Sequence, residues 1–189
     1  EEIAVMEQEQ TQLELGEYRE TVPSFMSHII AEITQQARQS PDISQSSGVS
    51  VRASVSNYEA LLANALRRAI RTGEQDVVPR ISDLPFIMPS LQGKVEFEAM
   101  EEGREETIMQ KLFADATLAV VRRFTDKLDM DTIALQFGDG MNVTTGESLP
   151  SSDYAQIIRR IEGLDNAVTL ISASDNPAVR ASAVEFILE

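Results

Sequence analysis

Apolar residues spaced at the period of an α-helix are the strongest constraint on how this sequence folds. The longest such pattern spans residues 51–72, where apolar side chains fall on one face of a helix of about six turns. These side chains are Val55, Tyr58, Leu61, Leu62, Ala65, Leu66, Ala69 and Ile70. Gly73 follows, and glycine readily adopts the left-handed conformation that ends many helices. The segment is therefore expected to pack one face against other helices.

The same periodicity recurs through most of the chain. Further helices are expected at residues 3–13, 25–37, 105–127, 131–137, 151–162, 164–172 and 177–189. Thr21 and Pro23 are typical of a helix start, as is Pro79, whereas Pro41 requires the helix before it to end. The best strand candidate, residues 93–100, is short. The sequence therefore predicts an all-α fold.

An acidic stretch, residues 93–103, is interpreted as a boundary or hinge. It divides an expected helical bundle in residues 1–92 from a second helical module in residues 93–189. The chain begins Glu1-Glu2-Ile3 inside what already reads as a helix, so we expect a fragment whose N-terminal portion is missing.

Composition narrows the function classes. The formal net charge of −15 disfavours nucleic acid and anionic lipid as partners over a broad face. No apolar run has the length of a membrane span, so we expect no membrane partner and a cytoplasmic location. The absence of cysteine excludes disulfides and thiol-based metal or nucleophile sites.

Motifs for self-contained enzyme chemistry are missing. There is no phosphate-binding loop of the G-x-x-x-x-G-K-[ST] type, and the glycine-rich residues 138–146 are interpreted as a turn. The aspartates of residues 129–140 have calcium-loop spacing, but apolar Ile133 and Ala134 occupy positions that need an oxygen ligand and a glycine. His28 has no ligand-type neighbours in sequence, so packing or solvent exposure is the expected role. No carboxylate pair indicates an acid–base dyad.

Four arginines belong to the segment around residues 51–72. Arg67, Arg68 and Arg71 cluster near its C-terminal end and are interpreted as helix-capping, solvated cations. Arg52 instead lies at the opposite end, where the helix dipole disfavours a cation. If Ser50 is the N-cap, backbone N–H groups and the Arg52 guanidinium converge on one region, which favours an anion such as phosphate.

Two alternatives remain open for Arg52. It could pair with a nearby glutamate or be solvated. A capping box formed by Ser56 and Glu59 could also start the helix later, which would place Arg52 in the preceding loop.

The stretch "SSGVSVRASVSNYEALLANALRRAIRTGE", followed by "VVPRISDL", resembles the helical lid of AAA+ ATPases of the MoxR and magnesium-chelatase ATPase-subunit clade. Gly48, Ser50 and Arg52 match the second-sensor motif, Gly-small-Ser-x-Arg, of that family. The resemblance covers residues 1–92 well and extends more loosely into the C-terminal region. It implies that residues 1–92 are the AAA+ lid and residues 93–189 a C-terminal helical extension.

The resemblance also implies a function. Arg52 would contact the γ-phosphate of ATP, with Gly48 and Ser50 shaping the loop, while the core ATPase motifs would lie upstream of this chain. ATP and Mg²⁺ would be cofactors of the full-length protein, and the fragment alone would bind neither. Expected partners are neighbouring AAA+ subunits in a ring and a protein with a von Willebrand A domain. The task would be remodelling of, or metal insertion into, a partner protein.

An alternative from a different class is a stand-alone acidic helical adaptor that binds a protein partner without nucleotide. A phosphate-binding loop encoded upstream in the same reading frame would favour the ATPase, and an initiator codon immediately before Glu1 would favour the adaptor.

Overall fold

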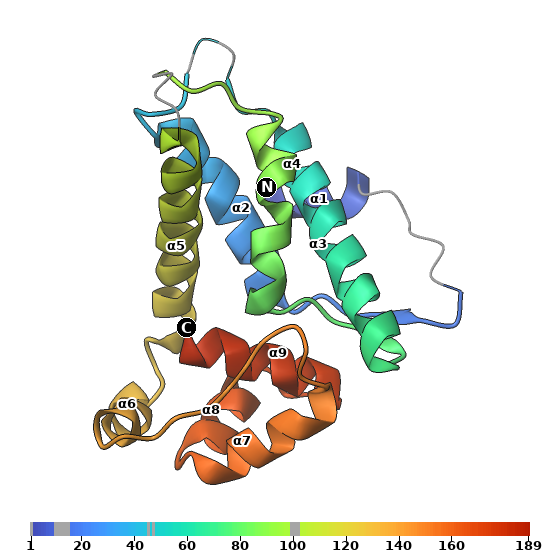
Figure 1. The fold of residues 1–189 in the computed structure, drawn as a ribbon, viewed down its shortest axis with the longest axis vertical. Helices are drawn as coiled ribbons and strands as arrows, with labels where there is room; N and C mark the ends of the chain where they lie inside the picture. Colours follow the sequence, from blue (N-terminus) through green and yellow to red (C-terminus); the bar gives the residue numbers. More distant parts are fainter. Residues whose placement is uncertain (1, 10–15, 45, 47, 99–102) are drawn as a thin grey trace.

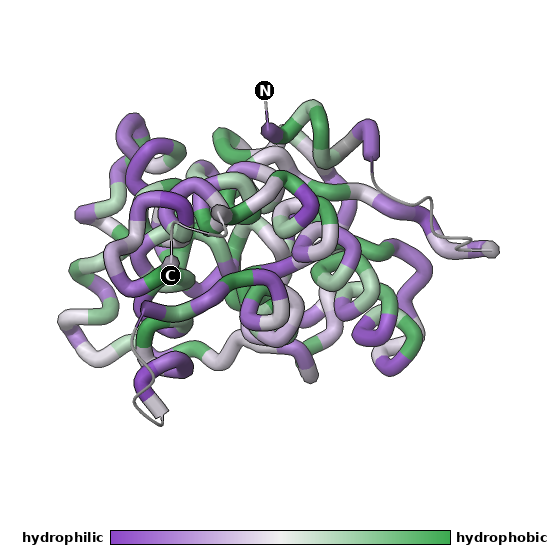
Figure 2. The backbone as a smooth tube through the Cα atoms, turned by 90° about the horizontal axis from the view of Figure 1, so that it is seen from above, coloured by the Kyte–Doolittle hydropathy of each residue, from purple (hydrophilic) through white to green (hydrophobic). Residues whose placement is uncertain are grey.

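The all-α prediction is confirmed. A computed structural model describes residues 2–9, 16–44, 46, 48–98 and 103–189, of which 67% are helical and 3% are in strands or bridges. Figure 1 shows a group of long helices above a compact group of short ones. In Figure 2 hydrophilic and hydrophobic residues alternate along the helices, as expected for amphipathic helices.

Three long helices form the upper group. They are α2 (Ser24–Gln39), α3 (Val51–Thr72) and α5 (Arg104–Thr125). Helix α2 packs against both α3 and α5 and lies between them (Figure 1). The shorter α1 (Glu2–Glu9) packs against α2 and α3.

Local signals set the ends of these helices as expected. Helix α2 begins directly after Pro23 and ends at Gln39, before Pro41. Helix α3 ends at Gly73, which adopts a φ of 72° and donates its N–H to carbonyls of the last turn. The predicted helix at residues 3–13 is α1 as far as Glu9, and residues 10–13 lie outside the described residues.

The lower group contains α6 (Met130–Gly138), η2 (Ser151–Asp153), α7 (Tyr154–Arg160), α8 (Leu164–Ile171) and α9 (Pro177–Leu188). Helix α9 packs against η2, α7 and α8, and it also contacts α5 and the 3₁₀ helix η1 (Ile81–Ile87). Most of its side chains are buried, so α9 is apolar on nearly every face. It therefore lies at the junction between the two groups of helices (Figure 1).

Aromatic side chains join the two groups in one continuous core. Phe25 of α2 stacks on Phe186 of α9, with ring centroids 4.3 Å apart. Phe124 of α5 packs edge-on against both rings, at 6.4 Å from Phe25 and 5.7 Å from Phe186. The predicted boundary at residues 92/93 remains a prediction, although α5, which follows it, packs along α2, which precedes it.

The best strand candidate, residues 93–100, forms no strand in its described part, where Phe97 makes an isolated bridge to Ile43. A two-residue parallel pairing forms instead between β1 (Arg19–Glu20) and β2 (Asp76–Val77). Such short strands carry no alternating pattern that the sequence could reveal.

The predicted helix start at Pro79 is wrong. Residues 78–80 are not helical, and η1 begins at Ile81 and leads into α4 (Met88–Gln92). Asp83 explains the shift, because its carboxylate accepts the Arg80 backbone N–H at 2.9 Å and so caps η1.

Candidate functional site

Ser50 is the N-cap of α3. Its backbone is extended, at φ −79° and ψ 160°, and its side-chain oxygen accepts the Arg52 backbone N–H at 3.2 Å. The helix begins at Val51, so Arg52 occupies the second helical position. The alternative start at Ser56 is wrong, because Ser56 lies inside the second turn of α3.

Arg52 extends from the first turn of α3 and is exposed to solvent. Among the described residues, its guanidinium has no hydrogen-bond or ion-pair partner. The alternative in which a nearby glutamate neutralises Arg52 therefore receives no support from the described part of the chain. The exposed side chain fits the solvated alternative, and a fixed cation at this position can also bind an anion from outside the chain. The Arg52 backbone N–H is donated to Ser50 Oγ and that of Ala53 to the Ser50 carbonyl, so the guanidinium itself supplies the donors for an anion.

The loop before Arg52 is shaped by Gly48 and held by Arg38. Gly48 has a φ of 66°, which side chains other than glycine rarely adopt, and the next residue, Val49, is buried. Arg38, in the last turn of α2, donates from Nε to the Val49 carbonyl at 2.7 Å. This role of Arg38 could not be predicted from the sequence, since 11 residues separate it from its acceptor.

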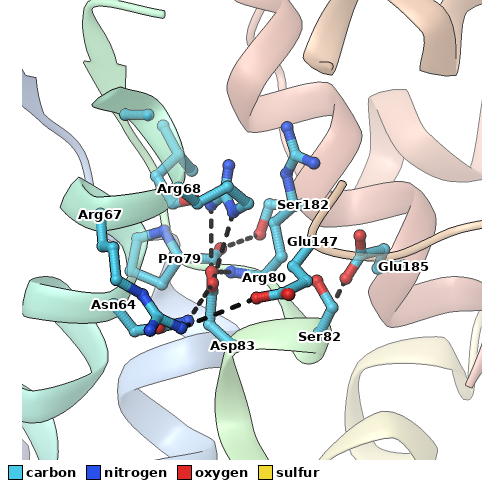
Figure 3. A network of polar contacts seen from close by, with 12 residues as sticks. Asn64, Arg67, Arg68, Pro79, Arg80, Ser82, Asp83, Glu147, Ser182 and Glu185 are labelled. Carbon is cyan, nitrogen blue, oxygen red and sulfur yellow. Dashed lines mark hydrogen bonds and ion pairs between the residues drawn. The ribbon is translucent and has the colours of Figure 1, made fainter. Parts of the chain in front are cut away.

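The interpretation of Arg68 as a solvated capping residue is wrong. Its side chain is only 1% exposed and lies in the interior among polar partners (Figure 3). Arg68 Nη2 donates to Asp83 Oδ2 at 3.0 Å and to the Val78 carbonyl at 2.5 Å. Asn64 Nδ2 donates to Asp83 Oδ1 at 2.7 Å. The helical spacing could have indicated that Arg68 is buried, because it lies three residues after the buried Ala65 on the apolar face.

Arg67 and Arg71 fit the earlier interpretation better, because both are largely exposed. Each nevertheless reaches Glu147 in the loop between α6 and η2, at 3.8 Å from Arg67 and 3.4 Å from Arg71. The guanidinium of Arg67 also lies over the Phe86 ring, 4.5 Å from its centroid. This glycine-rich loop therefore packs against the C-terminal end of α3.

Arg80 extends the buried polar contacts toward the lower helices. It is fully buried, donates to the Leu149 carbonyl at 2.8 Å and to Ser151 Oγ at 2.5 Å, and lies over the Tyr154 ring. Burial, reinforced by the nearby Arg68 cation, lowers the pKa of Arg80 from its ordinary value.

Glu185 of α9 completes this set of contacts. One carboxylate oxygen accepts the Tyr154 hydroxyl, and the other accepts the Ser82 backbone N–H at 2.8 Å. Burial first, and then the Glu185 charge and hydrogen bond, raise the pKa of Tyr154. We call Arg68, Asp83, Arg80, Tyr154 and Glu185 the buried polar network. It connects α3 and η1 to α7 and α9, and all five of its residues are buried.

The remaining candidates supply packing. His28 lies with Nδ1 2.8 Å from the Ser24 carbonyl and its ring edge-on to Phe124. Residues 130–138, part of the segment with calcium-loop spacing, form helix α6. Within the described ranges, no group of three or more His, Asp or Glu side chains is placed to hold a metal ion.

No protein-family model, curated protein or solved structure matches the chain. No helix in the part of the chain that the structure describes is long and apolar enough to cross a bilayer.

Proposed function

We propose that this chain is the helical lid and C-terminal region of an AAA+ ATPase similar to magnesium chelatase and MoxR proteins, in which Arg52 senses the γ-phosphate of ATP. The observation that carries the proposal is the exposed Arg52 guanidinium, without a partner among the described residues, at the capped start of α3. It occurs within the Gly-small-Ser-x-Arg motif formed by Gly48, Ser50 and Arg52.

Charge supports a phosphate as the ligand. A guanidinium remains positive at physiological pH and can bridge two oxygens of one phosphate. The net charge of −15 makes most of the surface unfavourable for an anion, so an anion site requires a local cation with free donors. Loss of the γ-phosphate on hydrolysis removes the contact and shifts the lid between two positions.

The rest of the nucleotide site belongs to an ATPase core upstream of this chain in the proposed full-length protein. That core supplies the groups that hold Mg²⁺ and the other phosphates. Neighbouring subunits in a ring and a von Willebrand A-domain protein are the proposed partners, in the cytoplasm. The work done is remodelling of, or metal insertion into, the partner protein.

ATP hydrolysis by the natural protein that contains this chain tests the proposal. Arg52→Ala should lower the hydrolysis rate at least tenfold, because a charge-assisted hydrogen bond contributes about 1.5–3 kcal/mol. Arg52→Lys keeps the charge but cannot form two parallel hydrogen bonds to one phosphate, so it should lower the hydrolysis rate less. The matched control is Arg159→Ala, since Arg159 is an exposed arginine of α7.

Two results would contradict the proposal. One is an Arg52→Ala variant that hydrolyses ATP at the same rate as the Arg159→Ala control. The other is a natural protein with no ATPase activity, which would favour the acidic adaptor.

A further inference from the structure

Arg38 uses all three of its guanidinium nitrogens to join three helices. Nε donates to the carbonyl of Val49, the residue before the α3 cap, at 2.7 Å. Nη1 donates to Glu2 Oε2 at 2.7 Å, and Nη2 donates to Glu2 Oε1 at 2.9 Å. The two bonds to Glu2 form a bidentate pair, which fixes orientation as well as distance.

The Glu2 carboxylate is also held from α3. Ser54 Oγ donates to Glu2 Oε1 at 2.5 Å and lies 2.8 Å from Thr34 Oγ1. Ser54 and Thr34 are both fully buried, and the Glu2 side chain is only 19% exposed. We call Glu2, Arg38, Ser54 and the Val49 carbonyl the Arg38 clamp. It fixes α1, α2 and the start of α3 relative to one another.

The clamp acts on the backbone that leads to Arg52. Gly48 makes the turn, the buried Val49 side chain anchors the loop, and Arg38 fixes the Val49 carbonyl. Arg52 follows three residues later on a helix whose first turn is capped by Ser50. Removal of the Arg38 guanidinium leaves the Val49 carbonyl without this donor and removes the hydrogen bond that ties it to α2.

We propose that Arg38 is a positioning residue for Arg52, holding the start of α3 so that the Arg52 guanidinium reaches the γ-phosphate. This inference rests on the proposed function. Arg38 does not touch the nucleotide and acts only through Arg52. Because the clamp includes Glu2 of α1, the position of Arg52 also depends on the docking of α1.

A double-mutant cycle in the natural full-length protein tests this role by ATP hydrolysis. Arg38→Met keeps most of the side-chain volume and removes the guanidinium. It should lower the rate about 3- to 10-fold when Arg52 is present, since misplacement of a binding group weakens catalysis. In the Arg52→Ala background, Arg38→Met should have no further effect.

A purely structural role would give a different result. Arg38→Met would then lower hydrolysis by the same factor with Arg52 or with alanine at position 52, and that outcome, or no effect at all, overturns the inference. If Arg52→Ala itself leaves hydrolysis unchanged, the proposed function fails first. The two failures are therefore distinguishable.

Glu2→Gln is the second variant, and it keeps the shape of the carboxylate while removing its charge. It should lower hydrolysis about two- to threefold, and again only when Arg52 is present. An equal effect in both backgrounds counts against the clamp. The matched control is Arg180→Met, which breaks an Arg–Asp pair between α9 and α8 and should leave the rate unchanged.

Discussion

Arg68 and Asp83 form an ion pair inside the protein, with Arg68 Nη2 3.0 Å from Asp83 Oδ2 and side chains that are 1% and 0% exposed. Asp83 also accepts the Asn64 amide and the Arg80 backbone N–H. Water cannot replace these partners, since the site is closed to solvent. The pair therefore links the C-terminal end of α3 to η1, and the rest of the buried polar network carries the link to α9.

Asp83→Ala should destabilise the protein by about 3–5 kcal/mol, because it removes the carboxylate 3.0 Å from Arg68 and leaves the buried cation with the more distant Glu74 carboxylate, at 3.7 Å. That is a large part of the total stability of a typical domain. Urea unfolding followed by circular dichroism measures the loss. Asp165→Ala is the control, because the Asp165 side chain is 74% exposed in its pair with Arg180, and it should cost at most about 1 kcal/mol. Equal costs for the two variants would contradict a stabilising role of the network.

Tyr154 should make stability fall at alkaline pH. Its pKa is raised by burial and by Glu185, so the folded protein keeps a phenol proton that the unfolded chain releases above about pH 10. The stabilisation is therefore complete below about pH 10 and declines as the pH rises above it.

Tyr154→Phe removes this proton, and with it the contribution of Tyr154 to the loss of stability at alkaline pH. At pH 8 the variant should be about 1 kcal/mol less stable, because Tyr154 loses its hydrogen bond to Glu185. Between pH 9 and pH 11 its melting temperature should fall less than that of the wild type. Parallel melting curves for the two proteins over this range would show that Tyr154 does not titrate as its burial predicts.

Ser50→Ala should cost about 1 kcal/mol by removing the side-chain cap of α3. Ser50→Gly should cost only about a few tenths of a kcal/mol, since glycine is tolerated at an N-cap. Thermal unfolding compares the two variants. A similar loss for both would mean that the hydroxyl contributes through something other than the cap.

The sequence predicted those parts of the fold that depend on neighbouring residues. The start of α3 follows from Ser50, its end from Gly73, and the end of α2 from Pro41, because caps and proline act within one helical turn. Arg52 could be singled out for the same reason, as a cation at a predicted helix start.

Contacts between distant residues could not be predicted in this way. The Arg38 clamp joins residues 36 positions apart, and Arg19 of β1 pairs with Asp76 of β2 over 57 positions. The spacing that placed Ala65 on the buried face of α3 also places Arg68 there. Its partner Asp83 lies 15 residues further along the chain, outside helix α3, so no helical pattern could predict its role as a buried acceptor.

The affinity of the natural full-length protein for ATP and for ADP, with and without Arg52, tests the central claim most directly. If Arg52 contacts the γ-phosphate, Arg52→Ala should weaken ATP binding by about 10-fold or more and leave ADP binding unchanged, because ADP lacks that group. Calorimetry with a slowly hydrolysed ATP analogue and with ADP gives both values. Equal changes for the two nucleotides, or no change for either, would contradict the assignment of Arg52 as a γ-phosphate sensor.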